Sequence, residues 1–320
     1  MRCFLNSLII VLTVGVAACS VETSDAPQVQ ALAAEPAIAP SIDLGSLPGF
    51  FDCLREEGEF VIASHRAGPA PGYPENSLET LKHAYASGLF VAEIDVVESR
   101  DGVLFLMHDN TLGRTTTGRG FVADTDWDEI ATLNLKDNAG QITRFTPPKL
   151  SDALLWAVST GAILELDKKE TTSFRNIISH VRAAEAEDNV ILITYSDQQA
   201  IEVARLAPDL MLTASVNSRD HQRELEAGGV NMENVIAWTG TSRPNDRAWS
   251  ALAWRGIESA FGTLGRPGER LDDAYIADGD LSEYADLIEG GLTLLATDEA
   301  YAVAAYLAPR NAALDMCAFW

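Results

Sequence analysis

Positive charge and cysteine are both scarce in this sequence. Its 23 lysines and arginines are outnumbered by 47 aspartates and glutamates, so the formal net charge is −24 at pH 7. Such a chain lacks the basic surface with which proteins bind nucleic acid or dock on anionic lipid. Its overall field also repels a small anionic ligand, so binding one requires a local centre of positive charge.

Three common functional motifs and a second long apolar segment are absent as well. The sequence has no Gly-rich nucleotide loop, no Cys-x-x-Cys pair and no Gly-x-Ser-x-Gly turn. These absences remove the usual sequence evidence for a nucleotide, thiol or serine-nucleophile site. Beyond the N-terminal stretch, no apolar run is long enough for a transmembrane helix. Nothing in the sequence predicts a protein partner.

Residues 1–18 have the pattern of an export signal. Arg2 precedes an apolar stretch at residues 8–18, which is too short to span a bilayer as a mature helix. The stretch leads to Cys19 in the order Val-Ala-Ala-Cys, which resembles the lipobox of bacterial lipoproteins. An ordinary secretory signal cut nearby is the alternative. We expect an exported protein of the cell envelope or periplasm, held on a bacterial membrane by a lipid on Cys19.

The rest of the chain divides into a short polar segment and one large domain. Residues 19–45 lack apolar periodicity and predict a flexible tether. Residues 46–320 fit a single domain. Cys53 and Cys317 flank that domain, and an exported compartment permits disulfides, so we predict that they are bridged. Two separate thiols are the alternative, because the sequence does not give the distance between their Cα atoms.

Eight apolar runs rich in β-branched residues recur along the domain. They lie near residues 60–64, 91–97, 162–166, 190–194, 210–215, 235–238, 257–261 and 292–296. Stretches with a helical pattern separate most of them. Alternating strands and helices predict a parallel sheet, and eight strands predict its closure into a TIM (β/α)8 barrel. Another run, residues 103–107, is expected to form a β-hairpin arm after the second strand, with a barrel strand as the alternative.

Polar residues follow the first of these runs and lie within the second. In a TIM barrel, catalytic groups lie where the strands end. The second run carries Glu93 and Asp95, and His108 follows the hairpin arm. A two-residue loop at residues 100–101 or 101–102 would place all three on one face of the hairpin, whereas a three-residue loop would not. Such a face suits a divalent-metal site with an acid/base beside it; a solvated polar face is the alternative.

Five short motifs in order resemble the signature of the glycerophosphodiester phosphodiesterase family. They are His65-Arg66, Pro74-Glu75-Asn76, Glu93-Ile94-Asp95, His108-Asp109, and Arg114-Thr115-Thr116 with Gly118. A weaker resemblance extends over roughly residues 60–307. One departure is Ala67, which stands where the family usually has a glycine. The resemblance implies hydrolysis of glycerophosphodiesters to an alcohol and sn-glycerol 3-phosphate, with a small-molecule phosphodiester as substrate.

The resemblance also implies roles for individual residues. Those roles are acid/base catalysis by His65 and His108, binding of one divalent cation, Ca²⁺ or Mg²⁺, by Glu93, Asp95 and Glu165, and phosphate binding by Arg66. The family usually has a lysine two residues after its third carboxylate, where this chain has Asp167. Asp167 is therefore left out of the ligand set, and Lys168 becomes a candidate substrate contact.

Further residues are expected to support this site. Trp238 and Phe261 lie at strand ends and are candidate substrate contacts, although both would be core residues in a protein without that function. Supporting positions behind the catalytic residues are expected for Glu75, Asn76, Asp109 and Arg114. Two other functions stay open: a phospholipase D-like activity on lysophospholipids or sphingomyelin, and a catalytically silent lipoprotein that binds glycerophospho-ligands.

The predicted anchor can be tested directly. Replacing the lipidated residue, Cys19→Ala, should release the protein from membranes, because one lipid-bearing cysteine provides the attachment. Fractionation of cells into membrane and soluble material measures this. Folding of the domain should be unaffected, since Cys19 lies well before the predicted domain and the tether is expected to contribute no core residue. Membrane retention of the variant would indicate a different anchor or a different cleavage site.

Overall fold

Eight short strands form the centre of the structure, a computed structural model that describes residues 41–318. A strand of a parallel barrel is covered on both faces, so it needs apolar side chains on both, and these strands are almost wholly buried. They are β1 (Val61–Ser64), β2 (Val91–Glu98), β4 (Ile163–Lys168), β5 (Val190–Ile193), β6 (Met211–Ala214), β7 (Val235–Trp238), β8 (Glu258–Gly262) and β9 (Leu294–Thr297).

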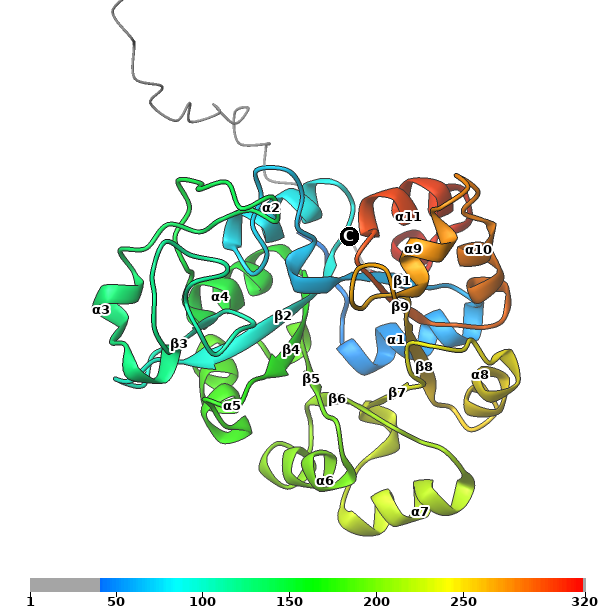
Figure 1. Ribbon diagram of the computed structural model, residues 1–320. Helices are drawn as coiled ribbons and strands as arrows, with labels where there is room; N and C mark the ends of the chain where they lie inside the picture. The colour runs from blue at the N-terminus through cyan, green and yellow to red at the C-terminus, as the bar shows by residue number, and fades with distance from the viewer. Residues whose placement is uncertain (1–40, 319–320) are drawn as a thin grey trace, which may run out of the picture. The chain divides into compact units, whose positions relative to one another are not determined.

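These strands are parallel and follow one another around a closed barrel (Figure 1). The first strand closes the ring, because β1 pairs with both β2 and β9. Each apolar run that the sequence analysis predicts as a barrel strand coincides with one of them. The predicted TIM barrel is therefore confirmed.

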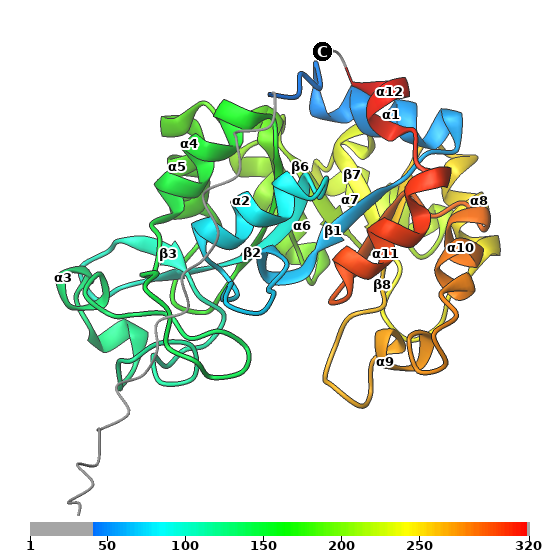
Figure 2. The same ribbon diagram turned by 90° about the horizontal axis from the view of Figure 1, so that it is seen from above.

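Helices surround the barrel and connect its strands (Figures 1 and 2). The longer ones are α1 (Leu47–Glu57), α2 (Leu78–Ala86), α4 (Leu150–Thr160), α5 (Phe174–Ala184), α6 (Asp197–Leu206), α7 (Arg219–Gly228), α8 (Asp246–Ala253), α10 (Ser282–Glu289) and α11 (Ala300–Leu307). Short α-helices are α3 (Trp127–Ile130), α9 (Leu271–Tyr275) and α12 (Ala313–Cys317), and the 3₁₀ turns are η1 (His65–Ala67), η2 (Val122–Asp124), η3 (Glu187–Asn189), η4 (Met232–Asn234) and η5 (Ala308–Arg310). Helices α2, α5, α6 and α7 each follow a serine whose hydroxyl accepts a backbone N–H, which caps the helix.

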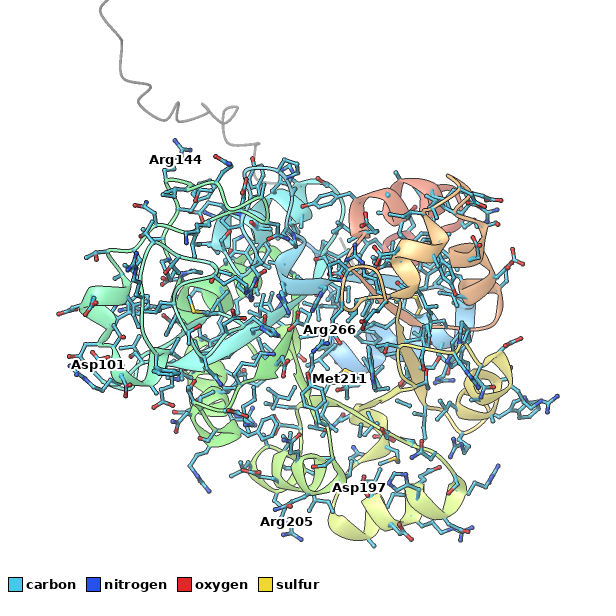
Figure 3. All side chains as sticks on the ribbon, in the orientation of Figure 1. Asp101, Arg144, Asp197, Arg205, Met211 and Arg266 are labelled. Atoms are coloured by element: carbon cyan, nitrogen blue, oxygen red, sulfur yellow. A yellow bond between two sulfur atoms is a disulfide. The ribbon has the colours of Figure 1, made fainter. Side chains whose placement is uncertain are left out.

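Apolar side chains pack inside the barrel and between the barrel and its helices (Figure 3). The largest cluster includes residues of every barrel strand. A second cluster gathers Phe60, Trp249, Phe261 and Tyr284 where β8 and β9 meet α8, α10 and α11. Burying this apolar surface is the main favourable term in the folding free energy.

The hairpin arm is present, but its loop differs from both predicted registers. Strand β3 (Leu104–Leu106) runs antiparallel to β2 and lies outside the barrel, which confirms the arm. Val96 pairs with Leu106, so the loop has three residues, 100–102, and Gly102 there has a φ of 85°. Such a loop needs a residue in the left-handed region, for which glycine is suited. His108 lies beyond the end of β3, so strand alternation does not orient its side chain.

An insertion with few regular elements joins β3 to α4. Its apolar side chains pack on the hairpin in a separate small cluster of Val97, Phe105, Met107, Leu112, Val122 and Ile130. Helix α3 and the turn η2 lie within this segment. The cluster fixes the insertion to the barrel and thereby holds the residues that follow His108.

Helix α1 lies at the end of the barrel where the strands begin. Its Arg55 donates a hydrogen bond of 2.8 Å to Glu258, the first residue of β8. A disulfide joins Cys53 on this helix to Cys317 on α12, with 5.6 Å between the two Cα atoms. The predicted bridge is therefore confirmed, and it links the first and last helices of the described domain.

Within residues 41–318, no helix combines the length and the apolar character that crossing a bilayer requires. The predicted export signal, Cys19 and the tether up to residue 40 lie outside the residues that the structure describes. The last residues of the predicted tether are described and belong to the domain instead, because Leu44 is buried in the main hydrophobic cluster and the Ile42 N–H donates to the Thr160 carbonyl.

The disulfide should contribute measurably to the stability of the domain. It closes a chain segment of 264 residues, and removing a native disulfide typically costs about 2–5 kcal/mol. We expect Cys53→Ser to lower the melting temperature, as measured by circular dichroism. The double variant with Cys317→Ser should match the single one, because either substitution removes the same bond. An unchanged melting temperature would show that the bridge does not stabilise the fold.

Candidate active site

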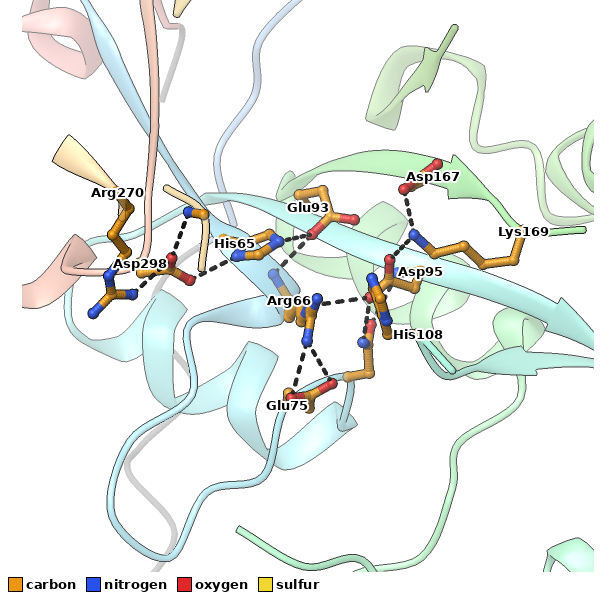
Figure 4. A network of polar contacts seen from close by, with 12 residues as sticks. His65, Arg66, Glu75, Glu93, Asp95, His108, Asp167, Lys169, Arg270 and Asp298 are labelled. Carbon is orange, nitrogen blue, oxygen red and sulfur yellow. Dashed lines mark hydrogen bonds and ion pairs between the residues drawn. The ribbon is translucent and has the colours of Figure 1, made fainter. Parts of the chain in front are cut away.

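The ends of the barrel strands bring polar residues together. His65 follows β1, Glu93 and Asp95 lie within β2, and Asp167 lies near the end of β4. Strands β1, β2 and β4 are neighbours in the barrel. Figure 4 shows these side chains with the charged residues around them. They occupy the end of the barrel at which TIM-barrel enzymes place their catalytic groups.

Three buried carboxylates form a tight group at this end. Glu93, Asp95 and Asp167 each offer an oxygen atom, and these atoms lie within 4.8 Å of one another. The strand register explains the grouping, because Asp95 is the direct partner of Asp167 across β2 and β4. Burial, and then the charges of Asp95 and Asp167, raise the pKa of Glu93 well above its ordinary value. Positive charge close to the group is therefore needed to stabilise all three carboxylates in their ionised form.

Glu165, which the resemblance assigns as the third cation ligand, lies outside this group. It is buried, and burial followed by the charge of Asp167 raises its pKa to about 7. Its side chain is on the same strand face as that of Asp167, two residues closer to the start of β4. The geometry thus favours Asp167 as the third ligand, a residue that the sequence analysis leaves out.

Two lysines follow Asp167, and the second one faces the site. The Nζ atom of Lys169 lies 2.5 Å from Asp167 Oδ2 and 2.6 Å from Asp95 Oδ1. The Nζ atom of Lys168 lies instead over the ring of Phe174, as strand alternation predicts. Lys168, the expected substrate contact, therefore points away from the acidic group, and Lys169 faces it instead. Lys169 also has the family's spacing, two residues after a carboxylate.

The donor set fits a hard divalent cation. All three candidate ligands are carboxylates, which suit Ca²⁺ and Mg²⁺. Among the described residues, Asp167 Oδ1 is buried without a hydrogen-bond partner. Burying a charged oxygen in this way is costly unless another group compensates. A cation held by Glu93, Asp95 and Asp167 would supply that compensation.

His65 is oriented by a carboxylate from the last barrel strand. Its Nδ1 lies 2.6 Å from Oδ1 of Asp298, which follows β9. Burial raises the pKa of Asp298, but its hydrogen bonds with His65, Arg270 and the backbone N–H of Gly265 together hold the pKa well below its ordinary value. Asp298 is therefore ionised, so His65 Nδ1 carries the donated hydrogen. The other ring nitrogen, Nε2, lies 3.9 Å from Glu93 Oε2 and faces the acidic group.

His108 has a similar arrangement on the hairpin side. Its Nδ1 lies 2.8 Å from Asp109 Oδ1. The Arg114 hydrogen bonds lower the pKa of Asp109 to about 2, so here too the histidine donates. Arg114 also donates two hydrogen bonds of 2.8 Å to Glu75, which in turn accepts one of 3.2 Å from Arg66. The expected supporting positions of Asp109, Arg114 and Glu75 thus form one connected network.

The backbone around Arg66 is held in an unusual conformation. Arg66, Ala67 and Asn76 all have positive φ, at 51°, 73° and 56°, a region that non-glycine residues seldom occupy. The φ of Ala67 explains why a glycine is usual at that position. The conformation lets the Arg66 N–H donate to Glu93 Oε2 at 2.8 Å. Asn76 donates to Asp95 Oδ2 at 2.6 Å and accepts from the Asp95 N–H at 2.9 Å.

The two aromatic candidates have different positions. Phe261 is fully buried and packs edge-on against Trp249, so it belongs to the hydrophobic core and cannot line a substrate cleft. The substrate contact expected of Phe261 is therefore wrong, because its side chain points to the helical layer. Trp238 is half-buried at the end of β7, and a Cβ on Gly262 would lie 2.9 Å from its ring. Its substrate contact stays a prediction.

Sequence reasoning gave no role to four residues of the site. Asp298 is selected by the strand-end rule, because it follows the last predicted strand, but no role was assigned to it. Lys169 could have been found by moving the carboxylate–lysine spacing along by two residues. Tyr195 follows β5 and donates its hydroxyl to Asp167. Arg270 lies in an irregular segment after β8, and no sequence signal points to it.

Comparisons with known proteins agree with this geometry. A family model described as the glycerophosphoryl diester phosphodiesterase family matches residues 65–225. The uncharacterized protein YqiK of Bacillus subtilis is 32% identical over 164 residues, which cover 48% of this chain and 67% of that protein. Several other curated relatives are matched over 24% to 65% of their length, so the chain spans only part of them.

Solved structures with the same fold extend the similarity to most of the chain. A glycerophosphoryl diester phosphodiesterase from Parabacteroides distasonis has a TM-score of 0.72 and 26% identity, covering 85% of this chain and 94% of its own. An Oleispira antarctica phosphodiesterase, solved with the product sn-glycerol-3-phosphate, has a TM-score of 0.59 and 19% identity, covering 79% and 99%. Since the family model matches just over half of the 320 residues, this chain belongs to the glycerophosphoryl diester phosphodiesterase family.

Proposed function

We propose that this protein hydrolyses glycerophosphodiesters to an alcohol and sn-glycerol 3-phosphate, with one divalent cation and the pair His65 and His108. One observation carries the proposal: two histidines, each oriented through Nδ1 by an ionised aspartate, flank a buried acidic group (Figure 4). Hydrolysis of a phosphodiester requires one proton to leave the nucleophile and another to reach the leaving alkoxide. Family membership and the product named for the Oleispira phosphodiesterase support the substrate class.

The acidic group would hold the cation. Glu93, Asp95 and Asp167 would be its protein ligands. When bound, such a cation stabilises the charge that develops on phosphate oxygens during the displacement. Its positive charge would also offset the electrostatic repulsion between a chain of net charge −24 and an anionic substrate.

The two histidines have the hydrogen-bonding pattern of acid/base groups. Because Nδ1 of each ring donates to an aspartate, Nε2 is left to accept or deliver a proton. The aspartates keep the rings in one orientation and stabilise them when they are protonated. The nucleophile is either water or the substrate's own glycerol hydroxyl, and either can give up its proton to one of these rings.

Arg66 has a free donor for the phosphate. Its Nη1 donates to Glu75, whereas its Nε is buried and has no hydrogen-bond partner among the described residues. The Nε atom lies 3.7 Å from Asp95 Oδ2, so it is beside the acidic group. A phosphate oxygen placed there would satisfy this donor in a charge-assisted hydrogen bond. Lys169 would contribute a second positive charge on the other side.

The cation requirement and its third ligand can be tested together. Excess chelator should abolish turnover, and Ca²⁺ or Mg²⁺ should restore it. Glu93→Gln should mimic chelation, and Asp167→Asn should weaken cation affinity by at least about tenfold in isothermal titration calorimetry. Glu165→Gln is the matched control, because Glu165 lies on the same strand face but outside the group, and we expect an affinity close to wild type.

Two results would contradict this assignment. Full activity in excess chelator would remove the cation from the mechanism. A large loss of affinity in Glu165→Gln, with none in Asp167→Asn, would restore Glu165 as the third ligand.

The histidine pair and the reaction can be tested in one set of assays. Purified protein is given glycerophosphocholine or lysophosphatidylcholine, and release of sn-glycerol 3-phosphate or of choline is measured. We expect turnover of glycerophosphocholine, reduced at least about a hundredfold in His65→Ala and in His108→Ala, with little change in melting temperature. His83→Ala is the control, since His83 stacks on Tyr73, away from the acidic group.

The assays separate this function from its alternatives. Choline release from lysophosphatidylcholine alone would indicate a phospholipase D-like enzyme. Binding of glycerophosphocholine without turnover would indicate a silent binding protein. Near-normal turnover in His108→Ala would leave the mechanism without its second proton-transfer group.

A further inference from the structure

Tyr195 makes a contact with the acidic group that the proposed reaction does not use. It follows β5, next to β4 in the barrel, and its hydroxyl donates a hydrogen bond of 2.8 Å to Asp167 Oδ2. The residue is 70% exposed, although the carboxylate that it contacts is buried. The phenol therefore reaches from the protein surface to a candidate cation ligand.

The backbone that carries this side chain is fixed. The Tyr195 N–H donates to Gln199 Oε1 at 2.7 Å, and the preceding residue, Thr194, donates its hydroxyl to the Thr213 carbonyl at 2.6 Å. Both contacts hold the start of α6 against the barrel. The exposed ring packs against little, so its hydroxyl contributes more to the orientation of Asp167 than to the core.

The two groups that donate hydrogen bonds to Asp167 differ in charge, so a bound cation would affect them differently. Oδ2 accepts from the ammonium group of Lys169 and from the neutral hydroxyl of Tyr195, whereas Oδ1 has no partner among the described residues. A cation arriving at Asp167 repels an ammonium group within hydrogen-bond distance. A neutral hydroxyl carries no net charge and can keep its hydrogen bond when the cation is present.

We propose that Tyr195 is a positioning residue for the cation site and acts through Asp167. Its hydroxyl holds the Asp167 carboxylate in one orientation toward Glu93 and Asp95, with or without the cation. Hydrogen bonds to metal-ligating side chains typically change metal affinity by about 10–100-fold. This inference rests on the proposed function only in taking the acidic group to be a cation site.

The test removes the hydroxyl and keeps the ring. Full-length Tyr195→Phe is titrated with CaCl₂ and with MgCl₂ by isothermal calorimetry, and its melting temperature is measured without metal. We expect the dissociation constant to rise about tenfold and the metal-free melting temperature to stay unchanged. Tyr306→Phe is the matched control, because the Tyr306 hydroxyl has no hydrogen bond among the described residues.

Each outcome decides between the possible roles. A dissociation constant in Tyr195→Phe that equals the wild-type value overturns the inference. So does a lower melting temperature with unchanged affinity, which would show a purely structural role. If wild-type protein binds neither Ca²⁺ nor Mg²⁺, the cation in the proposed function fails, and the inference fails with it. Equal loss of affinity in Tyr306→Phe would also overturn it, because the effect would then not depend on contact with Asp167.

Discussion

Repulsion among buried carboxylates is the constraint on which the site depends. Glu93, Asp95 and Asp167 lie with oxygen atoms within 4.8 Å of one another, and two like charges about 4 Å apart repel by about 4 kcal/mol at an effective dielectric constant near 20. The fold keeps them together because they extend from adjacent, fully paired strands. Lys169, the Arg66 N–H and the Asn76 amide offset part of this repulsion. What they leave uncompensated is available to bind a cation.

The groups around the acidic centre come from distant parts of the chain. His65 is oriented by Asp298, and His108 by Asp109 within the insertion. Behind Asp298 lies a second buried carboxylate, Asp272, which accepts hydrogen bonds from Thr297 and Tyr284 and from the Asp298 N–H. The barrel's closure between its first and last strands is what brings His65 and Asp298 together. Catalytic geometry in this protein therefore depends on the completion of the whole ring.

The barrel and most of the residues at the centre of the site could be predicted from the sequence. Buried parallel strands need apolar residues on both faces, and that requirement leaves a visible signal at each strand. His65, Glu93 and Asp95 could be placed because strand ends and motif spacing agree. Arg66 and Asn76 were expected to contribute side chains, and Arg66 contributes its backbone N–H as well, which donates to Glu93.

The errors come from features with no local signal. Two carboxylates on one strand face, Glu165 and Asp167, are both paired with a carboxylate of β2, Glu165 with Glu93 and Asp167 with Asp95. Only the three-dimensional positions of their oxygen atoms, which bring Asp167 into the acidic group, distinguish them. The number of residues in the hairpin loop depends on one glycine in the left-handed region, which an Asp-Gly pair does not specify. Phe261 ends a strand like a cleft residue, but alternation turns it outward. Arg270 and Asp298 follow two neighbouring strands, β8 and β9, and their ion pair has no sequence pattern at all.

The bridge between Cys53 and Cys317 converts most of the domain into a covalent ring. Every barrel strand, the hairpin arm and the insertion lie within the 264 residues that it encloses. A protease that cuts a single exposed loop of the insertion therefore opens the ring without releasing a fragment. The two pieces stay joined through the first and last helices and keep one molecular mass until a reductant separates them. A nicked molecule can thus retain all of its parts in place.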